Sequence, residues 1–340
     1  MENLGINMGE FWSDRRVLIT GATGFIGSWL TENLIKKDAK VTVIVRKDPL
    51  YHVLDHIKKV NFIHGDIKNK KIIDKAVKNQ EIIFHLAAIT QVLYSIKNPE
   101  ETFEVNLGGT LNILESLRRN SDAFLIFAST DKVYGEPTHL PIDENHPLSA
   151  KSPYDASKVA ADRLVYAYHK SYNLKTSIIR WSNTIGGRDS NILRIVPDTI
   201  ISLLSNKQPI IRGNGKHIRD YMYVEDAVNG ILTVAENQKT TNGEVFNLGT
   251  EKPNTVIEIV NSIIKLMKLQ DSFKPVILNK PTYGEIETQY LSCKKARKFL
   301  KWKPKFNLEQ ALLCTIEWYR NNSSWINMMR KVSKFCGIKY

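Results

Sequence analysis

The chain has 340 residues, of which 42% are hydrophobic and 24% charged, proportions that are ordinary for a soluble globular protein with a sizeable core. Its 48 lysines and arginines exceed its 35 aspartates and glutamates, which gives a formal net charge of +13. Because the lysines are scattered and no aromatic-interleaved basic stripe occurs, we expect no nucleic-acid partner; the same charge would favour an acidic small molecule such as a nucleotide diphosphate.

Apolar runs of the strand type alternate with helical patterns through the first half of the chain. The predicted strands fall at residues 16–20, 40–45, 61–65, 81–88, 123–129 and 175–180, and the predicted helices near 25–37, 69–78, 98–118 and 153–172. Strands that are almost continuously Val, Ile, Leu and Phe, alternating with helices, indicate a parallel sheet covered on both faces. The fold class that we expect is therefore α/β, with a doubly wound parallel sheet.

The regularity loosens beyond about residue 181, where short elements punctuated by proline follow one another. We expect a sheet domain over 1–180 with returning segments near 220–250, a smaller C-terminal lobe mainly over 181–322, and a tail helix over 323–340. Apolar residues recur at helical spacing in the tail, which favours a helix that docks on the body or on a second subunit.

The cysteines and the N-terminus bear on location. Cys293, Cys314 and Cys336 lie late in the chain, and no pair has metal-ligand spacing. An odd number of cysteines favours free thiols in a reducing compartment. The first sixteen residues lack the apolar core of a signal peptide, and no run approaches the ~18 apolar residues of a membrane-spanning helix. We therefore expect a cytoplasmic protein with no metal and no membrane attachment.

A glycine-rich turn joins the first predicted strand to the first helix. In "VLITGATGFIGSWL", Gly21 permits a tight turn, Gly24 lets the backbone approach a pyrophosphate, and Gly27 lets helix and strand pack closely. The N–H groups of the helix N-terminus then face the anion. A glycine triplet alone is weak, but this one lies at the strand-to-helix junction of the first βα unit. It predicts a Rossmann domain that binds NAD or NADP rather than a simple structural turn.

The end of the second strand, "VIVRKDP", bears on the choice of cofactor. An acidic residue there would hydrogen-bond the ribose 2′-hydroxyl, whereas an arginine accommodates a 2′-phosphate. Arg46 and Lys47 come first and Asp48 follows, so we expect NADP, with NAD as the alternative if Asp48 or a turn serves the ribose. Asp66, after the next strand, either contacts the adenine or caps the following helix.

Two polar patterns point to catalysis. The strand at 123–129 ends in Ser129, Thr130, Asp131 and Lys132. Some 25 residues later, Tyr154 and Lys158 lie four residues apart and hence on one face of the predicted helix. A lysine and the positive ring of a nicotinamide cofactor beside a phenol would lower its pKa from about 10 and make Tyr154 a usable base.

With these pieces in place, the chain resembles the extended short-chain dehydrogenase/reductases that act on nucleotide sugars. The matching segments are "TGATGFIGSWL", "GDI", "FHLAA", "VNLGGTLNILE", "ASTDKVYGE", "PYDASK", "RDYMYVEDA", "FNLGT" and "WKPKFNLEQALLCTIEWY", and they span roughly residues 10–322 in family order. The resemblance implies a Rossmann domain that holds NAD(P), a C-terminal lobe that holds a nucleoside-diphosphate sugar, and a homodimer formed through helices.

The resemblance also implies roles for individual residues. The implied catalytic set is Thr130, Asp131, Lys132, Tyr154 and Lys158. The implied cofactor contacts are Gly21, Thr23, Gly24, Phe25, Ile26, Gly27, Arg46, Lys47, Asp66, Ile67, Leu86, Ala87, Ala88, Tyr154 and Lys158. The implied substrate-side residues are Asn106, Thr130, Asn183, Arg194 and Arg219. Of these, Asn183 and Arg219 match positions that hold the substrate's phosphates, and Asn106 matches a helix position that orders the active-site backbone.

The residues after Thr130 separate dehydratases from epimerases in this family. The 4,6-dehydratases place an Asp directly after the hydroxyl residue, followed by a second ionisable group, whereas the epimerases need only hydroxyls and small residues there. Asp131 and Lys132 look like CDP-glucose 4,6-dehydratases and certain UDP-N-acetylglucosamine dehydratases, and "FW", "GSWL" and "RIVPD" lean toward the CDP-glucose group. Ile26, however, stands where that group often has a basic residue, and "VRK" looks more like GDP-mannose dehydratases, so the nucleotide stays open.

The implied reaction converts an NDP-hexose into an NDP-4-keto-6-deoxyhexose by oxidation at C4, loss of water and return of hydride to C6. Tyr154 would take the O4 proton, Asp131 would protonate the leaving 6-hydroxyl, and Lys132 or a water would remove the C5 proton. Lys132 could equally point away and pair with a carboxylate, since an exposed lysine near pKa 10.4 is protonated. The alternatives are a nucleotide-sugar 4-epimerase, which needs no acid at position 131, and an NADP(H)-sensing scaffold without catalysis.

Overall fold

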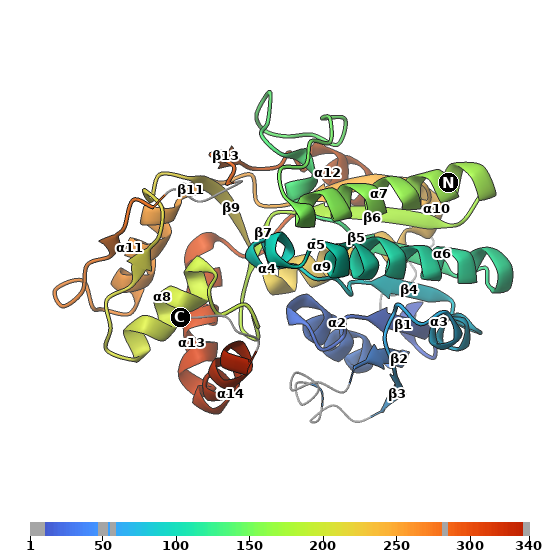
Figure 1. Ribbon diagram of the computed structural model, residues 1–340, viewed down its shortest axis with the longest axis horizontal. Helices are drawn as coiled ribbons and strands as arrows, with labels where there is room; N and C mark the ends of the chain where they lie inside the picture. The colour runs from blue at the N-terminus through green and yellow to red at the C-terminus, as the bar shows by residue number, and fades with distance from the viewer. Residues whose placement is uncertain (1–10, 47–53, 55–58, 281–284, 336–340) are drawn as a thin grey trace.

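A seven-stranded sheet occupies the middle of the larger part of the molecule (Figure 1). The computed structural model describes residues 11–46, 54, 59–280 and 285–335. In spatial order the strands are β10 (Val245–Leu248), β6 (Thr176–Trp181), β5 (Phe124–Ala128), β4 (Ile82–His85), β1 (Arg16–Thr20), β2 (Lys40–Val45) and β3 (Val60–His64). Every neighbouring pair is parallel, and the strand order reverses between β1 and β4. The α/β class and the doubly wound parallel sheet are thus confirmed.

Helices cover both faces of the sheet because successive side chains of a strand point to opposite sides. On one face, Ile19 shares an apolar core with α2 (Phe25–Lys36) and α9 (Val224–Glu236). On the other face, the core that contains Leu18 includes residues of α3 (Lys70–Val77), α6 (Gly109–Asn120) and α7 (Pro153–Tyr172). The near-continuous apolar strands of the sequence are therefore buried from both sides.

A smaller group of elements lies to one side of the sheet, at the left in Figure 1. Its mixed sheet is built around β9 (Ile218–Tyr223), which pairs in parallel with β7 (Asn183–Ile185) and β13 (Thr288–Gln289) and antiparallel with β11 (Pro253–Thr255). A second apolar core joins this sheet to α8 (Ile195–Leu204), α11 (Val256–Leu266), α13 (Leu308–Asn321) and α14 (Ser323–Phe335). The remaining elements are α4 (Val92–Lys97), α5 (Pro99–Phe103), α10 (Gln238–Thr241), α12 (Lys294–Leu300), β8 (Ile210–Ile211) and β12 (Val276–Ile277).

The structure departs from the sequence-based expectation in the helix predicted over 98–118. A single π-helical turn, η2 (Glu104–Gly108), separates α5 from α6. A π turn carries one extra residue and is frequent at functional sites. Asn106 lies in this turn, and its side chain is buried.

The "FW" pair before the first strand has a structural role. Trp12 is fully buried and lies beside Phe84 of β4, with the ring centroids 6.1 Å apart. Its Nε1 donates to Oε1 of Glu236 at the end of α9. Packing against the sheet therefore accounts for this tryptophan without reference to a substrate.

Some of the sequence-based predictions concern residues that the structure does not describe. Lys47 and Asp48, which bear on the cofactor, and Cys336 lie outside the described residues. In the part of the chain that is described, no helix is both long enough and apolar enough to cross a bilayer.

Candidate active site

The glycine turn has the geometry of a phosphate-binding loop. Gly21 has a φ of +74°, and a Cβ there would lie 2.7 Å from the backbone nitrogen of Ala87. A Cβ on Gly27 would collide with the carbonyl of Gly21, so both positions require glycine. Gly24 is the N-cap of α2, and no side chain caps the helix there. The first amides of α2 are thus left for an anion, and the residues present fit a dinucleotide pyrophosphate.

The segment after β4 lies against this turn. Leu86 N–H donates to the carbonyl of Thr20, and Ala87 N–H donates to the Thr20 hydroxyl. Thr20 in turn contacts Nδ1 of His85 at 2.7 Å, and burial lowers the pKa of that imidazole to about 3. The structure therefore brings the predicted contacts at 86–88 together with the glycine turn at the switch point between β1 and β4, where ligands of such sheets bind.

The residues predicted to contact the cofactor after β2 and β3 lie at the carboxyl ends of these strands, as the glycine turn after β1 does. Arg46 follows β2 and is exposed. The Asp66 carboxylate accepts from Lys68 N–H, so it forms a local turn and does not cap α3; the cap is Asn69. Ile67 is buried against Gly109 of α6. Of the two roles weighed for Asp66, helix capping is therefore ruled out.

The polar residues after β5 form a short 3₁₀ turn, η3 (Asp131–Tyr134). Thr130 is its N-cap: its hydroxyl accepts from Lys132 N–H at 3.3 Å and donates to Oδ1 of Asp131 at 3.1 Å. Oδ2 of Asp131 is buried and has no hydrogen-bond partner among the described residues. A buried carboxylate oxygen without a partner is costly, and a ligand hydroxyl would satisfy it.

Within the described part of the chain, the Lys132 amine pairs with a side-chain amide and not with a carboxylate. Nζ donates to Oε1 of Gln289 at 2.9 Å, and Nε2 of Gln289 donates to the main-chain carbonyl of Asp131 at 2.8 Å. Burial lowers the pKa of Lys132, against the opposing effect of the Asp131 carboxylate. The surroundings therefore increase the neutral fraction of this amine at neutral pH, contrary to what an exposed lysine would show.

Tyr154 and Lys158 project from the first turns of α7. Pro153 and a capping box between Ser152 and Asp155 begin the helix at this point. Both Tyr154 and Lys158 are buried, and Nζ of Lys158 donates to the carbonyl of Ala128, the last residue of β5, at 2.6 Å. The structure thus brings the helix pair to the end of the strand that leads into Thr130.

The protein groups by themselves shift the pKa of Tyr154 upward, so the predicted lowering of this pKa depends on the cofactor. Burial raises the pKa of the phenol to about 12, although the charge of Arg194 and the hydroxyl of Thr130 act in the opposite direction. Burial also lowers the pKa of Lys158 to about 7, against the effect of Asp162. Removing water from the phenol disfavours phenolate, so the positive charge that the sequence argument assigned to a cofactor has to overcome this effect.

Asn106 ties the helix pair to the segment after β4. Its Oδ1 accepts from Ile89 N–H at 2.8 Å, and its Nδ2 donates to the carbonyl of Ile89 and to Oγ of Ser157. Ser157 stands between Tyr154 and Lys158 on α7. These contacts are what a residue that orders the active-site backbone would make.

The three remaining substrate-side residues lie on the lobe. Nδ2 of Asn183, at the start of β7, is buried without a hydrogen-bond partner among the described residues. Arg194 pairs with Asp189 at 3.5 Å and lies close enough to Tyr154 to act on its pKa. Arg219 is buried and donates to the carbonyls of Ile218, Ile286 and Glu287. Nη2 of Arg219 also lies 3.8 Å from the carboxylate of Glu285.

Sequence reasoning missed two groups of residues around the site. One is Gln289, which contacts Lys132 across 157 residues of sequence and carries no motif. The other is the ion pair of Asp162 and Arg180, whose carboxylate also accepts from the hydroxyl of Ser129. Asp162 follows Lys158 by one helical turn, a spacing that could have suggested the contact.

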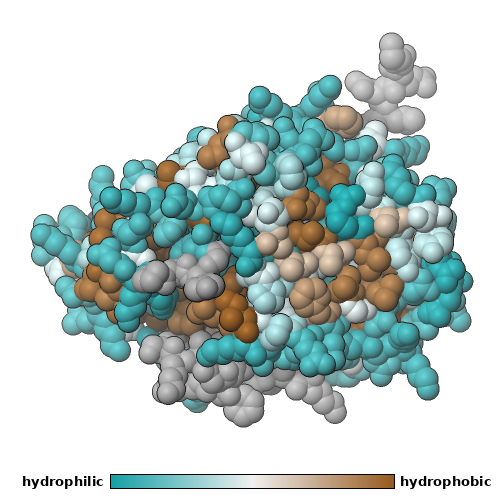
Figure 2. Space-filling view, turned by 45° about the horizontal axis from the view of Figure 1, so that its top comes forward, coloured by the Kyte–Doolittle hydropathy of each residue, from teal (hydrophilic) through white to brown (hydrophobic). Residues whose placement is uncertain are grey.

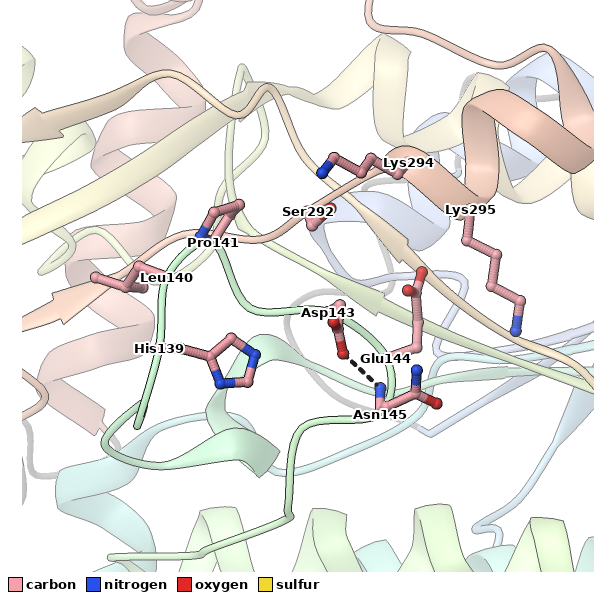
Figure 3. A pocket seen from close by; sticks show the side chains of 9 residues that line it. All are labelled: His139, Leu140, Pro141, Asp143, Glu144, Asn145, Ser292, Lys294 and Lys295. Atoms are coloured by element: carbon pink, nitrogen blue, oxygen red, sulfur yellow. Dashed lines mark hydrogen bonds between the residues drawn. The ribbon is translucent and has the colours of Figure 1, made fainter.

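A separate pocket of about 540 Å³ lies between the loop at 139–145 and the start of α12 (Figure 3). It contains none of the residues predicted for the site. Three of its charged side chains have partners: Asp143 accepts from Asn145 N–H, Glu144 accepts from Asn247 N–H, and Lys295 lies 2.7 Å from Glu244. Among the described residues, no group of three or more His, Cys, Asp or Glu side chains could hold a metal ion.

Comparisons with known proteins relate this geometry to a family. The family model described as GDP-mannose 4,6 dehydratase matches residues 18–314. A putative UDP-glucose 4-epimerase of Methanocaldococcus jannaschii is 34% identical over 90% of this chain and 99% of its own. A dTDP-glucose 4,6-dehydratase of Streptomyces antibioticus is 29% identical over 93% of this chain and 95% of its own.

A solved structure of a related enzyme has the same fold. The dTDP-glucose 4,6-dehydratase of Streptomyces venezuelae, determined with NAD bound, superposes with a TM-score of 0.84 at 26% identity. The match covers 91% of this chain and 98% of that one. The likeness therefore extends over the sheet and the smaller lobe together.

We predict that Tyr154→Phe lowers turnover by the ~10²–10⁴-fold typical of a lost acid–base group while cofactor affinity stays unchanged. The reason is that only the buried phenolic hydroxyl is removed. Lys158→Ala should lower both turnover and cofactor affinity, because the Lys158 amine is held at the end of β5, where the sheet domain is predicted to bind the cofactor. Turnover of a nucleotide sugar and cofactor titration by fluorescence give the two readouts. Tyr172→Phe, an exposed phenol at the far end of α7, is the matched control. Near-normal turnover in Tyr154→Phe would refute the catalytic role.

Proposed function

The chain belongs to the GDP-mannose 4,6-dehydratase family of the extended short-chain dehydrogenase/reductases, and from this membership we propose that it is a nucleotide-sugar 4,6-dehydratase. It is an enzyme of the branch whose members include NAD(P)-dependent dehydratases and epimerases of nucleotide sugars. The proposed reaction converts an NDP-hexose into an NDP-4-keto-6-deoxyhexose. The sheet domain would hold the cofactor and the smaller lobe the sugar nucleotide.

The observation that carries the proposal is the turn after β5. Asp131 follows Thr130 directly, and one of its carboxylate oxygens is buried without a partner among the described residues. An epimerase exchanges hydrogen at C4 and has no use for an acid that faces the sugar's leaving group. A dehydratase needs such an acid, because a hydroxide is a poor leaving group unless it is protonated.

The proposed roles follow from the place of each side chain around the ends of β5 and α7. When bound, NAD(P)⁺ accepts hydride from C4 and returns it to C6, so that no net oxidation occurs. Tyr154, as phenolate, takes the proton from O4. Asp131 would give a proton to O6 as the C6–O bond breaks, and the Lys132 amine would take the proton from C5. Loss of the C5 proton to Lys132 and of the 6-hydroxyl as water would form the C5–C6 double bond. As hydride returns to C6, the protonated Lys132 would give the proton back to C5, so atoms and charge balance.

An epimerase is the second candidate. The putative UDP-glucose 4-epimerase of M. jannaschii is the relative with the highest identity of those compared above. Thr130, Tyr154 and Lys158 would serve that reaction equally well. The two functions differ only in their need for Asp131 and Lys132.

The mass of the product separates these two functions. We predict that, in a panel of UDP-glucose, dTDP-glucose, CDP-glucose and GDP-mannose, the substrate that is turned over loses one water by mass spectrometry. Asp131→Asn should slow the elimination by ~10²–10⁴-fold while oxidation at C4 continues, because the amide keeps the shape but has no transferable proton. A 4-keto sugar that retains its 6-hydroxyl should then accumulate in a single turnover. A wild-type product of unchanged mass would refute the dehydratase and favour the epimerase.

The cofactor that we propose is NADP, on the basis of Arg46 at the end of β2. We predict that Arg46→Asp weakens NADP binding by roughly 10–150-fold, since a charge-assisted hydrogen bond contributes about 1.5–3 kcal/mol. NAD binding should be unchanged or improved. Titration of the purified protein with each cofactor gives both affinities, and Arg119→Asp, an exposed arginine near the far end of α6, is the control. Tighter binding of NAD than of NADP by the wild-type chain would contradict this assignment; the S. venezuelae relative has NAD bound.

We also propose that the protein is a cytoplasmic homodimer, as helical dimers are typical of the enzymes that it resembles. Hydrophobic residues gather on the face shown in Figure 2. Leu93 and Ile96 of α4 are 64% and 44% exposed and lie close together in sequence, so they could contribute an apolar contact to a second subunit. Leu93→Glu should convert the dimer to a monomer in sedimentation equilibrium, whereas Leu204→Glu on α8 should not. A monomeric wild-type chain would rule this out.

A further inference from the structure

Residues 285–293 run as a strap from the smaller lobe to the sheet domain. Ile218 N–H donates to the carbonyl of Glu287, and β13 pairs with β9. Farther along the strap, Ile142 makes two main-chain hydrogen bonds to it. Ile142 N–H donates to the carbonyl of Tyr290, and Ser292 N–H donates to the carbonyl of Ile142. Main-chain hydrogen bonds on either side therefore fix the backbone of Gln289.

The side chain of Gln289 is fully buried between the two ionisable residues of the turn after β5. Its Oε1 accepts from Nζ of Lys132 and its Nε2 donates to the carbonyl of Asp131. The reverse orientation of the amide would set NH₂ against an amine and oxygen against a carbonyl. Only one orientation therefore satisfies both contacts, and it holds the amine and the turn in one geometry.

The absence of charge on Gln289 affects the protonation of Lys132. The charged groups that face this amine are Asp131 in the same turn, Arg219 on β9, Asp155 on α7 and Glu285 on the strap. The amide of Gln289 adds a hydrogen-bond acceptor without adding a charge. A carboxylate in its place would favour the ammonium form and thereby remove the base.

We infer that Gln289 is a positioning residue that holds the Lys132 amine against the sugar's C5 while leaving it able to lose its proton. This inference rests on the proposed 4,6-dehydratase function. Gln289 itself touches no reacting atom: the Lys132 nitrogen takes the C5 proton, the C5–H electron pair forms the double bond to C6, and the C6–O pair leaves with a proton from Asp131 as water. The carbonyl contact of Gln289 keeps that acid beside the base.

Two substitutions separate charge from position. Gln289→Glu should slow the elimination at pH 7 by tenfold or more, since each unit by which the pKa of Lys132 rises lowers its neutral fraction about tenfold. The loss should shrink as the pH is raised. Gln289→Met removes both hydrogen bonds without adding charge, so its loss should not be recovered at high pH. Formation of the 4-keto sugar that retains its 6-hydroxyl should continue in both variants, and Gln270→Glu, an exposed position after α11, is the matched control.

A measurement on the wild-type protein without cofactor or substrate completes the test. Lysine ¹³Cε resonances, with Lys132→Ala to assign the signal, should show Lys132 titrating below the ordinary value of about 10.4, and Gln289→Glu should move the titration upward. Titration at the ordinary value, or equal pH profiles for Gln289→Glu and wild type, would overturn the inference. If the wild-type product does not lose water, the dehydratase proposal fails while the titration still tests the contact between Gln289 and Lys132.

Discussion

The buried ion pair between Asp162 and Arg180 holds together the elements on which the site is built. The carboxylate accepts two hydrogen bonds from the guanidinium, at 2.7 and 2.9 Å, and a third from the hydroxyl of Ser129. Arg180 on β6 also donates to the phenol of Tyr134, which ends the 3₁₀ turn. Removing one partner of such a pair leaves an unpaired buried charge, at a cost of ~3–5 kcal/mol. The pair therefore fixes α7, with Tyr154 and Lys158, against the strand that leads to Thr130.

The same carboxylate distinguishes the two lysines of the site. Asp162 lies one turn after Lys158 and opposes the fall in the pKa of Lys158 that burial causes, leaving it at about 7. The Lys132 amine hydrogen-bonds an amide instead of a carboxylate. At Lys132 three carboxylates, those of Asp131, Asp155 and Glu285, oppose the effect of burial. What sets Lys132 apart is the amide of Gln289, which accepts its hydrogen bond without adding a charge.

The parts that sequence could predict are those whose causes are local. The glycine turn follows from the positive φ at Gly21, and the start of α7 follows from Pro153 and the capping box of Ser152. The buried strands follow from their apolar runs. Gln289 lies in a strand of two residues with no periodicity, and its partner Lys132 is 157 residues away. The direction of the Tyr154 shift depends on burial, which only the assembled structure provides.

The strap also connects the smaller lobe to Lys132 through the pairing of β13 with β9. Gln289 stands opposite Arg219 in the pairing of β13 with β9. Nη1 of Arg219 donates to the carbonyls of Ile218 and Glu287 and Nη2 to that of Ile286, while no hydrogen bond in the described part of the chain uses Nε. Because a guanidinium has five N–H donors, Arg219 can hold the strap and still offer Nε–H to a phosphate. If a diphosphate binds Arg219 and the sugar C5 lies at Lys132, the pairing of β9 with β13 contributes to the distance between them, because Gln289, which holds Lys132, stands opposite Arg219.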